Sequence, residues 1–236
     1  MNSRRRIADQ KHSFPANRRS RRGRCWCSGR GRRGRAWQSW PGAGLTFSVL
    51  WRFEPGAPVP AGLSLVAGLA VARSLEELGV EGVQLKWPND VLVGTGKLAG
   101  ILAEVAAPGG GAPVIVVGIG LNVSLAADEL PDPVAVSLLS LGVAQPNRGQ
   151  LAAALLNRLH VRIAEWRAGG NVELLAVYRK HSSTLGQSVR AELPGGQEVV
   201  GQATDIDGNG ALLIDSAGGV VAVSAGDVVH LRPAVG

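Results

Sequence analysis

The chain has 236 residues, of which 45% are hydrophobic, and a formal net charge of +7. This length and composition indicate a globular protein that can bury one large core beside a small second domain. No apolar run reaches the ~18 residues of a membrane span, the Arg-rich start lacks the apolar core of a secretory signal, and two cysteines give no disulfide framework, so we expect a cytoplasmic protein without membrane association.

The positive charge is concentrated at the start of the chain. Residues 1–35 hold 13 of the 25 Lys and Arg residues and a single acid, Asp9, so the rest of the chain is mildly acidic. Residues 1–28 have no helical or strand period and few aliphatic side chains, which is typical of a disordered segment. Such a segment could bind nucleic acid without sequence preference, although charge runs are usually only solvated. We therefore expect no specific DNA binding.

Glycine and arginine alternate in the next segment, residues 29–40. Gly29, Gly31 and Gly34 spell a G-x-G-x-x-G, but the apolar strand and the helix that a dinucleotide site requires are missing on either side. Glycines let backbone N–H groups approach a ligand closely, and guanidinium groups match carboxylate or phosphate. The segment is either an anion-binding loop or a further piece of the solvated basic tail.

Strand and helix patterns alternate through the main body. Residues 44–53 are β-branched and aromatic, as in a strand, and residues 63–78 carry apolar side chains at helical spacing that ends at Gly79. Residues 98–105 and 114–117 are predicted to form a hairpin, and residues 128–142 an irregular segment at the surface. Asn147 is predicted to cap a long helix. The buried side of that helix is predicted to carry Leu151, Leu155, Leu159, Ile163 and Trp166.

A single lysine stands out in residues 83–104. Two apolar runs flank a turn that contains Asn89 and Asp90, and Lys97 opens the run that follows. A cation there, with carboxylate and amide side chains nearby, is well placed to meet an anion. Val91 and Leu98 replace the residues that a phosphate-binding P-loop needs. Surface lysines and Asn-Asp turns are also common structural features, so this pattern alone does not decide between a structural and a functional role.

The pattern changes to short strands near the end of the chain. Five are predicted, at residues 188–193, 198–206, 211–214, 220–223 and 228–231, and glycine-containing turns separate them. Five short strands in about fifty residues predict a small SH3-like β-barrel. The chain thus divides into a basic segment at 1–28, a main domain at 29–182 and a C-terminal domain at 185–233.

Several stretches resemble the biotin protein ligase family. They are KWPND followed by GKLAGILAE at residues 86–104, GRGRRGRAW at 29–37 and GIGLNV at 118–123. The resemblance begins at Gly29 and implies an α+β fold, with a mixed sheet packed with helices and a small C-terminal SH3-like barrel. The chain is similar to the biotin–[acetyl-CoA-carboxylase] ligases that lack an N-terminal DNA-binding domain. Part of the family's N-terminal catalytic segment, including a Ser-Thr-Asn motif, is missing.

The resemblance also implies a reaction and a set of site residues. Biotin and ATP would form biotinyl-5'-AMP with Mg²⁺ present, and biotin would then pass to a lysine of a biotin carboxyl carrier protein. Lys97 and Arg32 would be catalytic. The residues expected to bind biotin are Arg30, Gly31, Arg32, Lys97, Trp37 and Gly100. Those expected to bind ATP are Lys86, Asn89, Asp90 and Asn122, and no residue is expected to belong to a resident metal site.

Two other functions stay open at this point. Lipoate ligases and octanoyl transferases share the core fold, although the glycine–arginine loop and the KWPND motif argue against either of these activities. A ligase-like body of reduced activity could also carry a basic arm that binds nucleic acid non-specifically. Homodimer formation, common in the family, is a further expectation.

Overall fold

The computed structural model describes residues 27–30, 36–39, 42–54, 62–105, 112–130, 132–143, 147–193, 195–224 and 226–231. Its main sheet has five strands in the order β3-β7-β6-β5-β4. Their bounds are β3 Gly44–Arg52, β4 Val83–Lys86, β5 Asp90–Val93, β6 Gly96–Val105 and β7 Val114–Asn122. Every ladder between these strands is antiparallel, so the α+β class is confirmed but the sheet is not mixed. Short turns join β4 to β5 and β5 to β6, and short turns can only join antiparallel strands.

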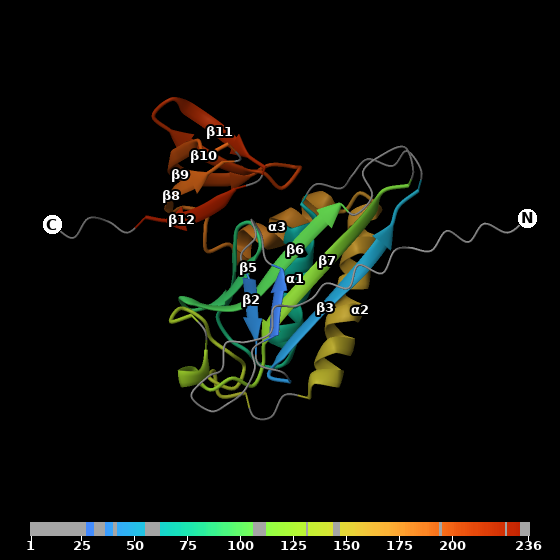
Figure 1. Ribbon diagram of the computed structural model, residues 1–236. Helices are drawn as coiled ribbons and strands as arrows, with labels where there is room; N and C mark the ends of the chain where they lie inside the picture. The colour runs from blue at the N-terminus through green and yellow to red at the C-terminus, as the bar shows by residue number, and fades with distance from the viewer. Residues whose placement is uncertain are drawn as a thin grey trace, which may run out of the picture.

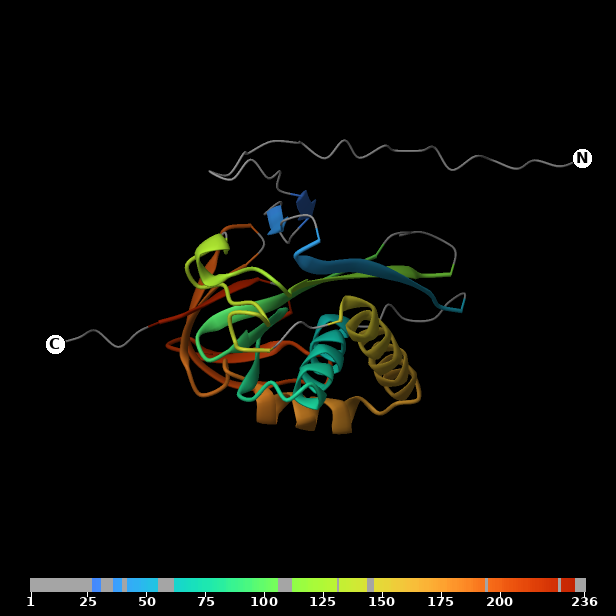
Figure 2. The ribbon, with the colours of Figure 1, turned by 90° about the horizontal axis from the view of Figure 1, so that it is seen from below.

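Three helices cover one face of this sheet: α1 Leu63–Glu77, α2 Arg148–Arg167 and α3 Asn171–His181 (Figure 1, Figure 2). Helix α1 ends as expected, since Gly79 follows it with a positive φ of 79°. The predicted cap of α2 is also confirmed, because the Asn147 side chain accepts hydrogen bonds from the N–H groups of Gly149 and Gln150. No helix among the described residues is both long and apolar enough to cross a membrane.

A small hairpin lies on the other face of the sheet. Strand β1, Cys27–Arg30, pairs antiparallel with β2, Ala36–Ser39, and Figure 2 shows both on the side opposite the helices. The sequence predicted a loop at residues 29–40, and the backbone instead pairs across it, with Gly29 opposite Trp37. Disorder was predicted for residues 1–28; this is wrong for Cys27 and Ser28, which belong to β1. Residues 1–26 lie outside the described residues, and so do Gly31 and Arg32.

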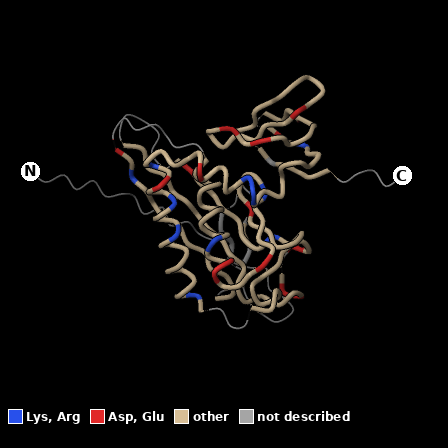
Figure 3. Tube along the Cα trace, turned by 180° about the vertical axis from the view of Figure 1, so that it is seen from behind, with Lys and Arg blue, Asp and Glu red and all other residues tan. Residues whose placement is uncertain are grey.

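The C-terminal segment forms a second antiparallel sheet, in the order β11-β10-β9-β8-β12. Its strands are β8 Ser188–Glu192, β9 Glu198–Ile206, β10 Leu212–Ser216, β11 Gly219–Val223 and β12 Asp227–His230, which confirms all five predicted strands. In the described part of the chain β11 and β12 are the two edges of this sheet, so closure into a barrel stays a prediction. Figure 3 shows acidic and basic residues interspersed over both sheets and the helices.

Candidate functional site

An irregularity in β6 puts two site residues on one face. Val91 of β5 pairs with Ala99, whereas the next residue, Leu92, pairs with Lys97, so Leu98 is an extra residue in the ladder. In a regular strand, residues three apart point to opposite faces. Because of the bulge at Leu98, Lys97 and Gly100 point to the same face.

A row of paired residues crosses the whole sheet on that face. Lys86 pairs with Asp90, Asp90 with Gly100, Gly100 with Gly120, and Gly120 with Thr46. Directly paired residues of neighbouring strands share a face. The helices pack against the other face, where Leu85 and Ile101 meet Gly68 of α1. The row therefore lies on the face that looks toward the β1–β2 hairpin.

The middle of the row is a flat area made by Gly100 and Gly120, here called the glycine floor. The indole of Trp37 lies directly on it. A Cβ atom added at Gly120 would come 2.6 Å from Trp37 Cε2, and one added at Gly100 would come 3.0 Å from Trp37 Cζ3. Carbon atoms normally stay about 3.5–4.0 Å apart, so only glycine allows this approach. The Nε1–H of Trp37 is buried and has no acceptor among the described residues.

Lys97 and Asp90 stand at the edge of the glycine floor. The Lys97 Nζ lies 2.7 Å from Asp90 Oδ1 and 5.9 Å from the centre of the Trp37 ring, within the range of a cation–π contact. About a third of the Lys97 side chain is exposed. The cation is therefore oriented by a carboxylate while it remains open to a further anion.

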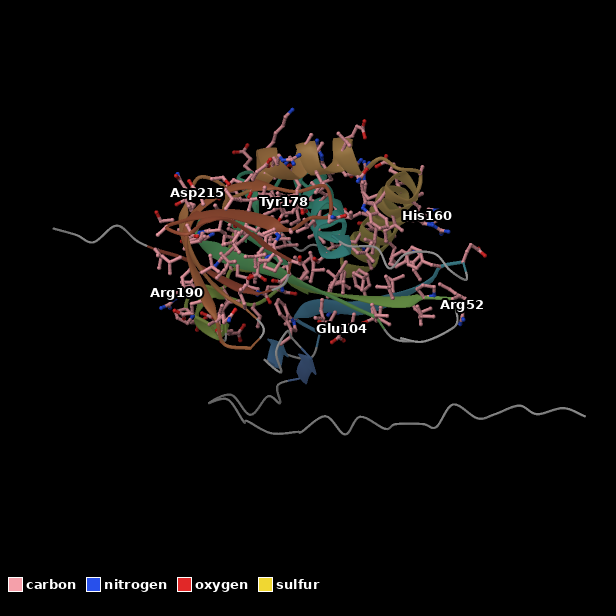
Figure 4. All side chains as sticks on the ribbon, turned by 90° about the horizontal axis from the view of Figure 1, so that it is seen from above. Arg52, Glu104, His160, Tyr178, Arg190 and Asp215 are labelled. Atoms are coloured by element: carbon pink, nitrogen blue, oxygen red, sulfur yellow. The ribbon has the colours of Figure 1, made fainter. Side chains whose placement is uncertain are left out.

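The charge of Asp90 also affects a tyrosine in the core, Tyr178. Tyr178 of α3 is fully buried, and Figure 4 shows it within the packed body, whereas His160 and Arg190 lie at the periphery. Burial raises the pKa of Tyr178 far above its ordinary value, and the negative charge of Asp90 raises it further. Tyr178 is therefore a neutral core residue, and the negative charge of Asp90 disfavours its ionisation.

A segment between β7 and α2 fixes the main chain of Lys97. The Lys97 N–H donates to Val134 O at 2.7 Å, and the Val136 N–H donates to Lys97 O at 2.9 Å. The side chain of Asn122 holds the same segment, since its Nδ2 donates to Val136 O at 2.9 Å. The segment is irregular, as predicted, but Ser137 and the residue after it are fully buried rather than at the surface.

Asn89 braces the turn before β5. Its Nδ2 donates to Ile101 O at 3.0 Å, and its own carbonyl accepts from the Ile101 N–H at 2.9 Å. Lys86, at the end of the row, is half-buried. Burial of His230 and the positive charge of Lys86 both lower the pKa of His230.

The structure thus brings together four of the expected site residues: Lys97, Trp37, Gly100 and Asp90. Lys86 lies in the same row, whereas Asn89 and Asn122 bond to the backbone of neighbouring segments. Arg30 belongs to β1, but its side chain is outside what the structure describes, as are Gly31 and Arg32. Within the described residues no three His, Cys, Asp or Glu side chains cluster as metal ligands would. Sequence reasoning missed Gly120, although the alternating glycines of residues 118–120 marked a face without side chains.

Two family profiles match this chain. The Biotin/lipoate A/B protein ligase family matches residues 8–122, and the biotin protein ligase C terminal domain matches residues 184–231. The first match begins ahead of Gly29, so the likeness to the family starts earlier than the sequence reading placed it. The second match covers the sheet of β8 to β12.

Curated relatives agree with these profiles. The chain is 56% identical over 173 residues to the biotin–[acetyl-CoA-carboxylase] ligase of Mycobacterium tuberculosis, which covers 72% of this chain and 62% of that protein. It is 35% identical over 218 residues to the bifunctional ligase/repressor BirA of Escherichia coli, covering 92% and 64%. It is 32% identical over 222 residues to the biotin–[acetyl-CoA-carboxylase] ligase of Paracoccus denitrificans, covering 89% and 85%. The chain therefore spans less than two thirds of the length of the first two relatives.

Solved structures give the same result. The biotin protein ligase from Aquifex aeolicus in complex with biotin and ATP superposes with a TM-score of 0.73 at 28% identity, over 87% of this chain and 85% of that one. The Leishmania major enzyme in complex with biotinyl-5-AMP gives a TM-score of 0.54 at 26% identity, over 84% and 85%. With both profiles and these relatives in agreement, the chain belongs to the biotin protein ligase family.

Proposed function

We propose that this chain is an ATP-dependent biotin protein ligase. It activates biotin to biotinyl-5'-AMP and transfers the biotinyl group to a lysine of a biotin carboxyl carrier protein. The observation that carries the proposal is the Lys97–Asp90 pair at the edge of the glycine floor, beneath the Trp37 indole. We assign the catalytic domain to residues 29–182 and the C-terminal domain to residues 185–233.

The reaction needs a cation where Lys97 stands. In the first step the biotin carboxylate attacks the α-phosphorus of ATP and pyrophosphate leaves. In the second step the ε-amine of the carrier lysine attacks the carbonyl of this mixed anhydride and AMP leaves. Two anions must approach each other in the first step, so catalysis is a matter of positioning and charge stabilisation. Lys97 offsets part of the repulsion between the two groups, and Asp90, 2.7 Å away, directs its ammonium.

The glycine floor and the Trp37 indole that lies on it together offer a ligand ring one packing surface. Gly100 and Gly120 present only backbone, and Trp37 adds an aromatic surface with a buried N–H that finds no acceptor in the described part of the chain. A ligand ring packed against the Trp37 indole would place a carboxylate on a flexible chain near Lys97, whose Nζ lies 5.9 Å from the centre of the indole ring. We therefore assign Trp37, Gly100 and Lys97 to biotin, together with Arg30, Gly31 and the catalytic Arg32 of the glycine–arginine segment.

We assign the nucleotide to the side of the turn before β5. Lys86 supplies a positive charge, and Asp90 ends the turn. Asn89 and Asn122 act through the backbone segments that they hold, since their amide groups donate to Ile101 O and Val136 O. Mg²⁺ would arrive with the phosphates of ATP and keep most of its waters, because such sites use only one or two protein carboxylates. Asp90 is the carboxylate that fits this role.

Three other expectations stay predictions: homodimer formation, the lack of specific DNA binding and the cytoplasmic location.

The decisive experiment combines binding with turnover. Calorimetric titration with biotin, with and without ATP, should show binding that tightens when ATP is present. Biotin-dependent exchange of pyrophosphate into ATP should follow, and labelled biotin should appear on a carrier domain. Lipoate offered in the same assay is the control. Exchange with lipoate and none with biotin would refute the proposed substrate.

A further inference from the structure

The connection between the two sheets lies along the edge of the main sheet. Residues 182–187 join α3 to β8, and Ser182 forms a parallel bridge with Leu85 of β4. The Ser183 N–H then donates to Leu85 O at 2.9 Å. The edge strand that leads into the Lys86–Asp90 turn is thus held by the connection to the C-terminal sheet, and not only by β5.

Trp87, the first residue of that turn, is held at two points. Its backbone N–H donates to Thr184 Oγ1 at 3.0 Å, and its indole Nε1 donates to Gly210 O at 3.0 Å. Trp87 is 1% exposed and Thr184 is 0% exposed. A buried N–H needs its acceptor, so removal of the Thr184 hydroxyl would leave the Trp87 amide unpaired in a dry environment. His230 of β12 also bonds to this hydroxyl, with Nε2 at 3.2 Å from Thr184 Oγ1.

The turn connects these contacts at Trp87 to the residues proposed to bind the nucleotide. The Asn89 N–H donates to Lys86 O at 3.2 Å and closes the turn, and Lys86 pairs with Asp90. Asp90 in turn contacts Lys97. A shift of the Trp87 main chain must therefore move Asp90 relative to Lys97, and misplacement by about 1 Å can cost about a hundredfold in rate.

We infer that Thr184 is a positioning residue for adenylate formation, through which the C-terminal domain fixes the Lys86–Asp90 turn. The inference rests on the proposed ligase function. Thr184 touches no proposed substrate, and it acts on the turn through the Trp87 amide. The inference predicts an effect on the chemical step with ATP, while binding of biotin alone, against Trp37, is unaffected.

The test compares Thr184→Val with Thr184→Ser. Valine keeps the shape of threonine but cannot accept the Trp87 hydrogen bond, whereas serine can. We expect Thr184→Val to lower kcat for biotin-dependent pyrophosphate exchange about ten- to hundredfold, with an unchanged calorimetric Kd for biotin in the absence of ATP, and Thr184→Ser to restore most of the rate.

Arg179→Met is the matched control for loosened contact between the domains. Arg179 of α3 pairs with Asp205 of β9 at 2.6 Å and donates to Ile206 O, so it also joins the main body to the C-terminal sheet, but without a bond to the turn residue Trp87. Arg179→Met should leave kcat close to that of the wild type. An equal loss in Arg179→Met, or a normal kcat in Thr184→Val, would overturn the inference.

Amide hydrogen exchange decides the structural part without any turnover. If Thr184 fixes the turn, Thr184→Val speeds exchange at Asn89 as well as at Trp87, and Arg179→Met does not. Unchanged protection of Asn89 in Thr184→Val contradicts the inference even in a chain that lacks ligase activity. Lack of pyrophosphate exchange in the wild-type chain would instead count against the proposed function.

Discussion

Lys97 Nζ and Asp90 Oδ1 lie 2.7 Å apart, although Asp90 begins one strand and Lys97 lies near the start of the next. The bulge at Leu98 makes this contact possible, because it turns Lys97 toward the face that carries Asp90 and Gly100. The ion pair, the glycine floor and Trp37 then form one surface. The proposed chemistry depends on the position of this single ammonium.

Replacement of Lys97 by alanine should abolish adenylate formation. The variant loses the cation that offsets repulsion between carboxylate and α-phosphate, and loss of one such group typically costs about 10²–10³-fold in rate. Pyrophosphate exchange measures the effect, and circular dichroism should show an intact fold, since about a third of the side chain is exposed. Lys180→Ala, at an exposed residue of α3, is the control and should behave as the wild type. Near-normal exchange by Lys97→Ala would remove this residue from the mechanism.

Addition of one methyl group at Gly120 should disturb the biotin side. A Cβ there would lie 2.6 Å from Trp37 Cε2, so the indole must leave the glycine floor. We expect Gly120→Ala to raise the calorimetric Kd for biotin tenfold or more, which corresponds to a loss of about 1.4 kcal/mol in binding free energy. Gly118→Ala is a close control on the same face of β7, because its nearest neighbour, Ser48 Oγ, would be 3.6 Å away. Equal Kd values for the two variants would show that Trp37 does not shape the site.

The strands and the Lys97–Asp90 neighbourhood could be predicted because their signals are local. Alternating apolar residues, the glycine at Gly94 and the turn at Asn89 all lie within a few residues of one another. Asn147 likewise predicted its helix start from side-chain chemistry alone. Such features depend on the order of residues and not on the tertiary fold.

The rest of the site could not be predicted because it depends on pairings distant in sequence. Gly120 gains its role only when β6 and β7 align and Trp37, more than eighty residues earlier, covers them. The bond from Trp87 Nε1 to Gly210 O spans 123 residues. The bulge at Leu98 leaves no mark in an apolar run. The mixed sheet was only an implication of the family resemblance, because alternation along one strand carries no information on the direction of its neighbours.

Loss of the Asn122 amide should loosen the segment that holds Lys97. Asn122→Ala leaves the Val136 carbonyl without its side-chain donor in a buried place, and such a loss costs about 1–3 kcal/mol. Urea denaturation should show a lower free energy of unfolding, and limited proteolysis should cut first within residues 132–143. Asn171→Ala removes an exposed bond to Gly208 O and is the control, with a smaller effect. If the two variants lose equal stability and are cut at the same sites, Asn122 does not anchor this segment.

Stability should depend on pH through His230, because burial and the charge of Lys86 lower its pKa below the ordinary value of 6.5. Between these two pKa values the unfolded chain binds more protons than the folded one. The free energy of unfolding therefore falls as the pH drops from above 6.5 toward the pKa of His230 in the folded chain. Below that pKa the contribution of His230 to stability is constant. His230→Asn should remove that part of the pH dependence, which urea denaturation between about pH 5 and pH 8 would reveal as a smaller fall on acidification than in the wild type. His160→Asn, at an exposed residue of α2, is the control and should keep the dependence of the wild type. Parallel stability curves for the wild type and His230→Asn would mean that the proton on His230 is not linked to folding, and that Lys86 and the C-terminal sheet are not electrostatically coupled in solution.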